Sequence, residues 1–159
     1  TAAVEDAEED LAALGQGSEP GHSGALEAAR HAQSAGAWFD PDRSGEGVLI
    51  EVLPDGRGAL HWFGYDALDP QRQSWLSGIG TFEGTTLEVA DLLQPVGGGF
   101  GPGFDPARVE RVTWGQARIE FRNDGTALLS WSSTLPGFGS GELALARITR
   151  PALLLQPGD

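Results

Sequence analysis

The sequence contains no cysteine and no methionine, and all ten of its basic residues are arginine. Without cysteine there is no disulfide, zinc–thiolate site, iron–sulfur cluster or covalently attached c-type haem. Without methionine the chain starts at Thr1 with no initiator. A removed signal peptide would account for this start, and so would artificial trimming. The first explanation predicts a secreted or cell-surface protein. No apolar run approaches the roughly 18 residues that span a membrane, so we expect no membrane insertion.

The charge is strongly one-sided, with 23 acidic against 10 basic residues and a net charge of −13. Such a surface repels nucleic-acid phosphates and anionic membranes, so we expect no nucleic-acid partner. It attracts cations, and calcium is therefore the one cofactor that the composition leaves open. The chain also has 24 glycines and 10 prolines, which favours many turns over long helices.

Residues 1–34 form an acidic N-terminal arm with short helical or irregular structure. One amphipathic helix is predicted near the N-terminus and a second helical segment over 25–30. The arm has two interpretations: a solvated linker, or a segment that docks on a neighbouring subunit. Its apolar residues, which would make the docking contact, are Val4, Leu11 and Leu14.

Residues 35–150 alternate between short apolar-patterned strands and turns. The pattern predicts an all-β fold, an antiparallel meander of roughly seven or eight strands that forms a sandwich or a small barrel. The clearest hairpin turn is Asn123-Asp124-Gly125. The tail, residues 151–159, is apolar and contains Leu153, Leu154 and Leu155. The strands are predicted over 46–53, 59–65, 73–79, 85–93, 116–122, 126–132 and 142–148.

The most distinctive segment, residues 36–47, reads G-A-W-F-D-P-D-R-S-G-E-G. With Trp62-Phe63-Gly64-Tyr65 and later aromatic and glycine blocks, it resembles a family of secreted β-domains of unassigned function from Gram-negative bacteria. The resemblance covers roughly residues 36–149 and implies export and a β-fold, but no activity. Members often carry cysteine near positions 123–124, where this chain has none.

The same segment has the spacing of a calcium-binding loop, in which short acidic residues at alternate positions direct several oxygens at one ion. The alternative is a turn with a solvated acidic face, which is favoured because a proline interrupts the loop and a strand follows it. The candidate ligands are Asp40, Asp42, Ser44, Glu46 and Glu51.

Five tryptophans could stack against sugar rings or fill a core. Trp62 and Trp131 alternate with polar residues on predicted strands, so we expect them in the core. Trp38 and Trp75 lie nearer turns and are the candidates for exposure and ligand binding. No catalytic constellation is evident, and a non-enzymatic protein is predicted.

Two functions remain open. The first is an extracellular structural or assembly protein that associates with itself or another surface protein through its arm, its tail or free sheet edges. The second is a secreted module, calcium-dependent or not, that binds a glycan or another surface ligand.

Overall fold

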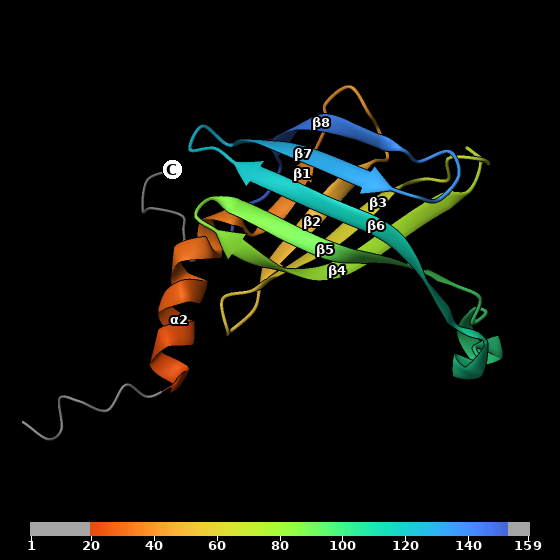
Figure 1. Ribbon diagram of the computed structural model, residues 1–159, viewed down its shortest axis with the longest axis horizontal. Helices are drawn as coiled ribbons and strands as arrows, with labels where there is room; N and C mark the ends of the chain where they lie inside the picture. The colour runs from red at the N-terminus through yellow and green to blue at the C-terminus, as the bar shows by residue number, and fades with distance from the viewer. Residues whose placement is uncertain (1–19, 153–159) are drawn as a thin grey trace, which may run out of the picture.

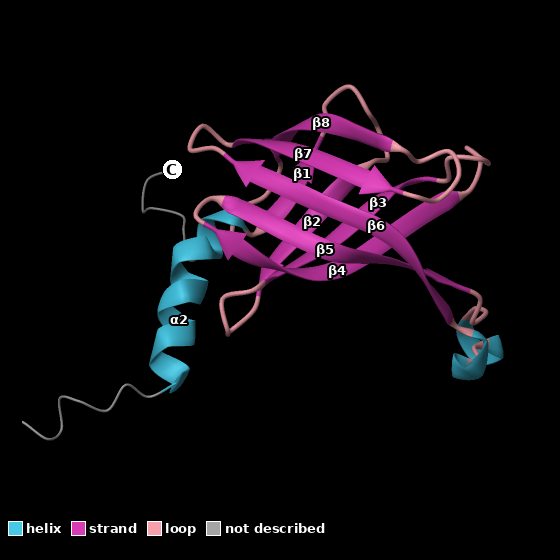
Figure 2. Cartoon of the chain, viewed as in Figure 1, coloured by secondary structure: helices cyan, strands magenta, loops and turns pink. Residues whose placement is uncertain are grey.

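The computed structural model describes residues 20–152, which fold into eight antiparallel strands closed into a barrel (Figures 1 and 2). The predicted all-β fold is confirmed, and of the two predicted architectures it is the small barrel. The strands are β1 Gly36–Phe39, β2 Gly47–Val52, β3 Gly58–Tyr65, β4 Gln73–Glu83, β5 Thr86–Val96, β6 Glu110–Phe121, β7 Thr126–Ser133 and β8 Ser140–Arg147. The helical elements are α2 Pro20–His31, η1 Ala32–Ser34, η2 Gly101–Gly103 and η3 Pro106–Arg108.

The strands form a simple meander in which each pairs with the next along the chain. The barrel closes where β1 pairs with β8, with Trp38 opposite Arg147 and Phe39 opposite Ala146. Every described strand therefore has a hydrogen-bonded neighbour on both sides, and none keeps a wholly free edge. Closure uses strand edges within the chain, and association through sheet edges stays a prediction.

Alternate side chains of each strand point into the barrel and fill it. On β6, for example, Ala117, Ile119 and Phe121 are buried, and the residues between them lie nearer solvent. This period of two is the one the sequence displays. β6 nevertheless starts before the predicted 116, because its first half pairs with the end of β5 after shifts in register.

The barrel has two different ends. At one end, here called the helix end, lie α2, η1, the last residues of β8 and the tight turns between strands (Figure 1). The opposite end, here called the loop end, carries the longer connections 40–46, 66–72, 97–109 and 134–139. The loop 97–109 contains η2 and η3, and Asp105 caps η3 by accepting a hydrogen bond from the Ala107 backbone N–H, as the Asp-Pro pair predicts.

Helix α2 begins at Pro20, earlier than predicted, and its C-terminal end packs on the barrel. The ring of His31 stacks on Phe82 of β4 with centroids 4.1 Å apart. Any side chain at Gly56 in the β2–β3 turn would press against Glu27. Residues 20–34 of the predicted arm are thus attached to the β-domain. The predicted contact residues of the arm and tail, Val4, Leu11, Leu14, Leu153, Leu154 and Leu155, lie outside the described residues. No helix between residues 20 and 152 is long and apolar enough to cross a membrane.

Three aspartates stabilise turns by accepting hydrogen bonds from nearby donors. Asp55 accepts from the Arg57 N–H at 3.1 Å, and Asp66 accepts from the Leu68 N–H at 2.9 Å. Asp124 accepts from the hydroxyl and the backbone N–H of Thr126. These hydrogen bonds hold the pKa of each carboxyl group below its usual 3.8.

These lowered pKa values predict a specific acid sensitivity. A carboxyl group whose pKa is depressed in the folded state stabilises the fold above its unfolded pKa, and this contribution is lost as the pH falls through the folded-state pKa. We expect the melting temperature to fall as the pH drops below about 3.8. The triple variant Asp55→Asn, Asp66→Asn, Asp124→Asn keeps the turn acceptors but cannot titrate, so its melting temperature should fall less steeply. Identical slopes in thermal melts from pH 2 to 6 would contradict this.

Candidate ligand-binding site

The loop 40–46, which holds most of the sequence signature, is folded around one arginine. The Arg43 guanidinium lies between two carboxylates, 3.5 Å from Asp40 Oδ2 and 3.2 Å from Glu46 Oε2. Asp40 Oδ1 also accepts a hydrogen bond from the Asp42 N–H at 3.0 Å, which closes the turn. Gly45 has a φ of +85°, and any side chain there would collide with the hydroxyl of Tyr65. The glycine is therefore required by both the turn and the close approach of Tyr65.

The calcium-binding loop predicted from Asp40, Asp42, Ser44, Glu46 and Glu51 does not form. Glu51 lies on the outer wall of β2 with a side chain that is 62% exposed, and its nearest charged partner is His61 at 4.0 Å. The cation between Asp40 and Glu46 is Arg43, which belongs to the protein itself. Among residues 20–152, no three acidic or histidine side chains gather where they could hold a metal ion.

A cavity of about 140 Å³ opens at the loop end, directly inside this loop. We call it the loop-end cavity. Its walls are aromatic, and its polar groups lie in the signature loop and on β3 and β4. The aromatic lining consists of Trp62, Tyr65, Trp114, Trp131 and Phe138, and the polar lining includes Arg43, Glu46 and Ser74.

The aromatic walls are held at fixed angles by edge-to-face packing. The ring of Trp62 lies 5.5 Å from that of Trp114 at 70° and 5.4 Å from that of Trp131 at 69°. Phe138 packs on Trp114 at 5.3 Å and 74°. These geometries are the favourable arrangements for aromatic pairs, so the walls are rigid before any ligand arrives.

The indole nitrogens of two wall residues differ in their hydrogen bonding. Trp131 Nε1 donates to the Phe138 carbonyl at 3.3 Å. Trp114 is 1% exposed, and its Nε1 has no hydrogen-bond partner among the described residues. A buried donor without an acceptor costs about 1–3 kcal/mol.

The two tryptophans predicted to bind ligand lie elsewhere. Trp38 is 1% exposed and its Nε1 donates to the Ser34 carbonyl at 3.1 Å, so the prediction of exposure is wrong. Its place on β1 turns the indole into the barrel, although the residue is close to a turn. Trp75 is 48% exposed, as predicted, on the outer wall of β4 opposite Phe63 of β3. Trp75 is not part of the cavity.

Trp62 and Trp131 were predicted to lie in the core. Trp62 is buried, which confirms the prediction, and Trp131 is half-buried, which confirms it in part. The sequence reasoning missed Trp114 and Phe138. Both residues lie next to glycines. A strict period of two places Trp114 and Ala117 on opposite faces of β6. The register shift at Gly115 brings both side chains to the inner face, and the sequence pattern does not reveal this shift.

Comparison with protein-family models, with curated proteins and with solved structures finds no match to this chain. The resemblance to secreted β-domains therefore stays a prediction. The functional assignment rests on the geometry of the barrel and its cavities.

Proposed function

We propose that this barrel is a non-enzymatic binding module whose loop-end cavity holds one neutral sugar ring, the terminal unit of a glycan. The observation that carries the proposal is a cavity of about 140 Å³ in which edge-to-face aromatic walls stand beside the polar side chains of Arg43, Glu46 and Ser74. An apolar cavity of about 150 Å³ accommodates a single six-membered ring such as benzene. The cavity volume therefore suits one ring and not an extended chain.

The walls match the apolar faces of a sugar. A pyranose ring presents C–H groups on its faces and hydroxyl groups around its edge. Trp62 and Trp131 line the cavity and would supply apolar ring surface for the C–H groups. The hydroxyl groups would meet the polar side chains of the cavity, Arg43, Glu46 and Ser74.

The polar groups favour a neutral, hydroxyl-bearing ligand. The Glu46 carboxylate accepts hydrogen bonds from hydroxyl groups, and the Arg43 guanidinium donates them. Because these two side chains are 3.2 Å apart and neutralise one another, they select for neither an anion nor a cation. The Glu46 side chain is only 18% exposed, so its contacts are partly shielded from water.

The scaffold fits this role. A closed eight-stranded barrel is rigid and of a size that holds one small ligand at its mouth. The loop carrying Arg43 and Glu46 is fixed by the turn at Gly45 and by Tyr65, whose hydroxyl donates to the Ser44 carbonyl at 3.4 Å. A secreted location, predicted from the sequence, is where a glycan ligand would be met. The alternative prediction of assembly through arm and tail depends on residues outside 20–152 and stays a prediction.

Replacing Glu46 by Gln should weaken sugar binding without unfolding the barrel. A hydrogen bond to a charged group is worth about 1.5–3 kcal/mol, so the dissociation constant should rise about tenfold or more. The measurement is a titration of intrinsic tryptophan fluorescence with neutral monosaccharides and disaccharides. The matched control is Glu51→Gln, which changes an exposed glutamate on the outer wall and should leave the affinity unchanged.

Two results would contradict the proposal. One is that no neutral sugar changes the fluorescence of the wild-type protein at millimolar concentrations. The other is that Glu46→Gln and Glu51→Gln bind equally well.

A further inference from the structure

A second cavity, of about 380 Å³, lies at the helix end of the barrel. We call it the helix-end cavity. It forms where the end of α2, η1, the β4–β5 turn, the β6–β7 turn and the end of β8 meet. Its basic lining residues are Arg30, His31, Arg122, Arg147 and Arg150, and no Asp or Glu is among the residues that line it.

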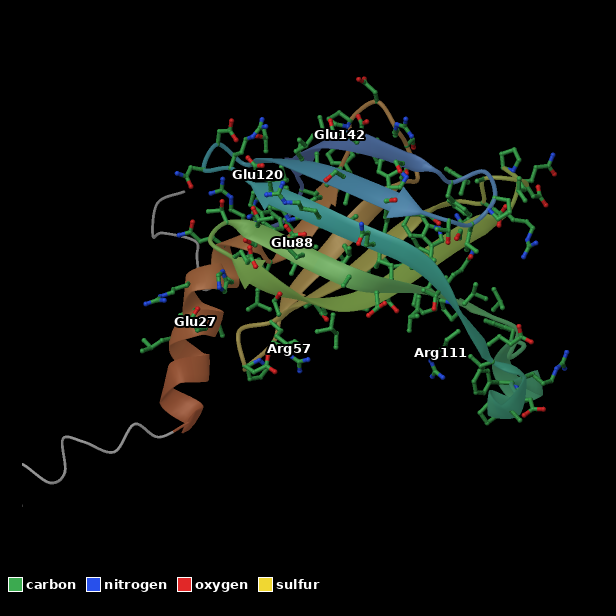
Figure 3. The ribbon with its side chains drawn as sticks, viewed as in Figure 1. Glu27, Arg57, Glu88, Arg111, Glu120 and Glu142 are labelled. Atoms are coloured by element: carbon green, nitrogen blue, oxygen red, sulfur yellow. The ribbon has the colours of Figure 1, made fainter. Side chains whose placement is uncertain are left out.

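This concentration of positive charge is unusual for the molecule. The chain carries 23 acidic and 10 basic residues, yet four of its arginines line one cavity. Elsewhere the barrel strands carry Glu88, Glu120 and Glu142 (Figure 3), and Glu88 is paired with Arg118. The helix-end cavity is therefore a local positive site on an anionic protein.

The four arginines are not equally engaged. Arg147 donates to the Ala35 carbonyl at 2.8 Å and to the Gln33 carbonyl, so its guanidinium is held in place by backbone. Arg30 is paired with Glu27 at 2.7 Å. Arg122 and Arg150 are exposed and make no ion pair within residues 20–152.

Two acidic residues lie beside the cavity: Glu27, which pairs with Arg30 and His31, and Asp124, which interacts with Arg122. Burial lowers the pKa of Arg147, and the nearby positive charge of Arg150 lowers it further, because two like charges lie close together. The Asp124 carboxylate already accepts hydrogen bonds from the hydroxyl and the backbone N–H of Thr126. These hydrogen bonds and the charge of Arg122 hold the pKa of Asp124 below 3.8.

From this arrangement we propose that the helix-end cavity binds the oxyanion of a small soluble ligand, a phosphate or carboxylate group. Guanidinium groups suit this role because their planar donors pair with two oxygens at once. Arg122 and Arg150, which make no ion pair within residues 20–152, supply donors from two different elements, and Arg147 adds fixed positive charge from within the cavity. The site is separate from the loop-end cavity, and neither proposal depends on the other.

The test uses the full chain with inorganic pyrophosphate and with citrate as probes, at low ionic strength, by isothermal titration calorimetry and amide chemical shifts. We expect saturable binding of at least one probe, with shifts confined to the residues of the helix-end cavity. The affinity should fall as NaCl is added, because the charges are partly exposed.

Removing the charges of Arg122 and Arg150 should weaken this binding. In the double variant Arg122→Gln, Arg150→Gln the affinity is expected to fall about tenfold or more, since charge-assisted hydrogen bonds are lost. The control is Arg118→Gln on the outer wall, where the arginine pairs with Glu88 at 2.8 Å. It should leave the affinity unchanged. If circular dichroism shows that the double variant is unfolded, the affinity of the single variant Arg150→Gln is measured in its place. Arg150 lies after the last strand, so its replacement should leave the barrel folded.

The proposal is overturned if neither probe binds the wild-type chain saturably, or if the arginine variants bind as the wild type does. It is also overturned if the chain binds phosphatidic acid vesicles but neither soluble probe, because the ligand would then be a membrane surface.

Discussion

Trp38→Ala is expected to lower the free energy of unfolding by about 3–5 kcal/mol. The indole is 1% exposed, packs on Phe121 at 5.2 Å and donates to the Ser34 carbonyl. Truncation would leave a cavity in the core and an unpaired buried carbonyl next to η1. It would also weaken β1, the short strand that closes the barrel against β8.

The matched control for Trp38 is Trp75→Ala. Trp75 is the same residue type but 48% exposed on the outer wall, so we expect a loss of about 1 kcal/mol or less. Denaturant unfolding followed by far-UV circular dichroism measures both values. A similar loss in the two variants would show that the inward orientation of Trp38 is wrong.

Arg147→Met should destabilise the fold by about 2–3 kcal/mol, because a charged donor to several carbonyl groups is lost. The guanidinium connects the end of β8 to Gln33 and Ala35, and lies 4.1 Å above the ring of Trp38. Together with the Trp38 indole, it connects the segment after α2 to the barrel. Met keeps much of the apolar volume, so the effect isolates the hydrogen bonds and the cation–π contact.

Hydrogen exchange gives this prediction a second readout. In Arg147→Met the backbone amides near Ala35 should exchange faster, while those of the β6–β7 hairpin change little. Arg118→Met, which breaks an exposed ion pair with Glu88, is expected to alter stability by about 0.5 kcal/mol or less. If Arg147→Met lowers the free energy of unfolding no more than Arg118→Met does, the hydrogen bonds of Arg147 to Gln33 and Ala35 do not stabilise the fold.

Local turn chemistry made much of the strand pattern predictable. Pro54-Asp55-Gly56 and Asn123-Asp124-Gly125 each separate two alternating segments, and the structure forms a hairpin at both. The choice between sandwich and barrel was not predictable, because it depends on the pairing of Trp38 with Arg147. Those residues are far apart in the sequence, and no periodicity encodes that contact.

The candidate site was predictable only in fragments. Glu46 was selected for its spacing as a calcium ligand, but in the structure its carboxylate is paired with Arg43. Trp114 lies before a register shift that hides its inward direction. The arginines of the helix-end cavity come from α2, a turn and the end of β8, so only the closed barrel brings them together.

The most direct test of the proposed function is an NMR titration of the indole N–H signals with neutral sugars. The chain has five tryptophans and therefore five such signals. We expect the signals of the three tryptophans that line the cavity, Trp62, Trp114 and Trp131, to move, whereas that of Trp38, hydrogen-bonded to the Ser34 carbonyl at the helix end, stays unchanged. If no indole signal moves, or only that of Trp75 on the outer wall does, the loop-end cavity is not the sugar site.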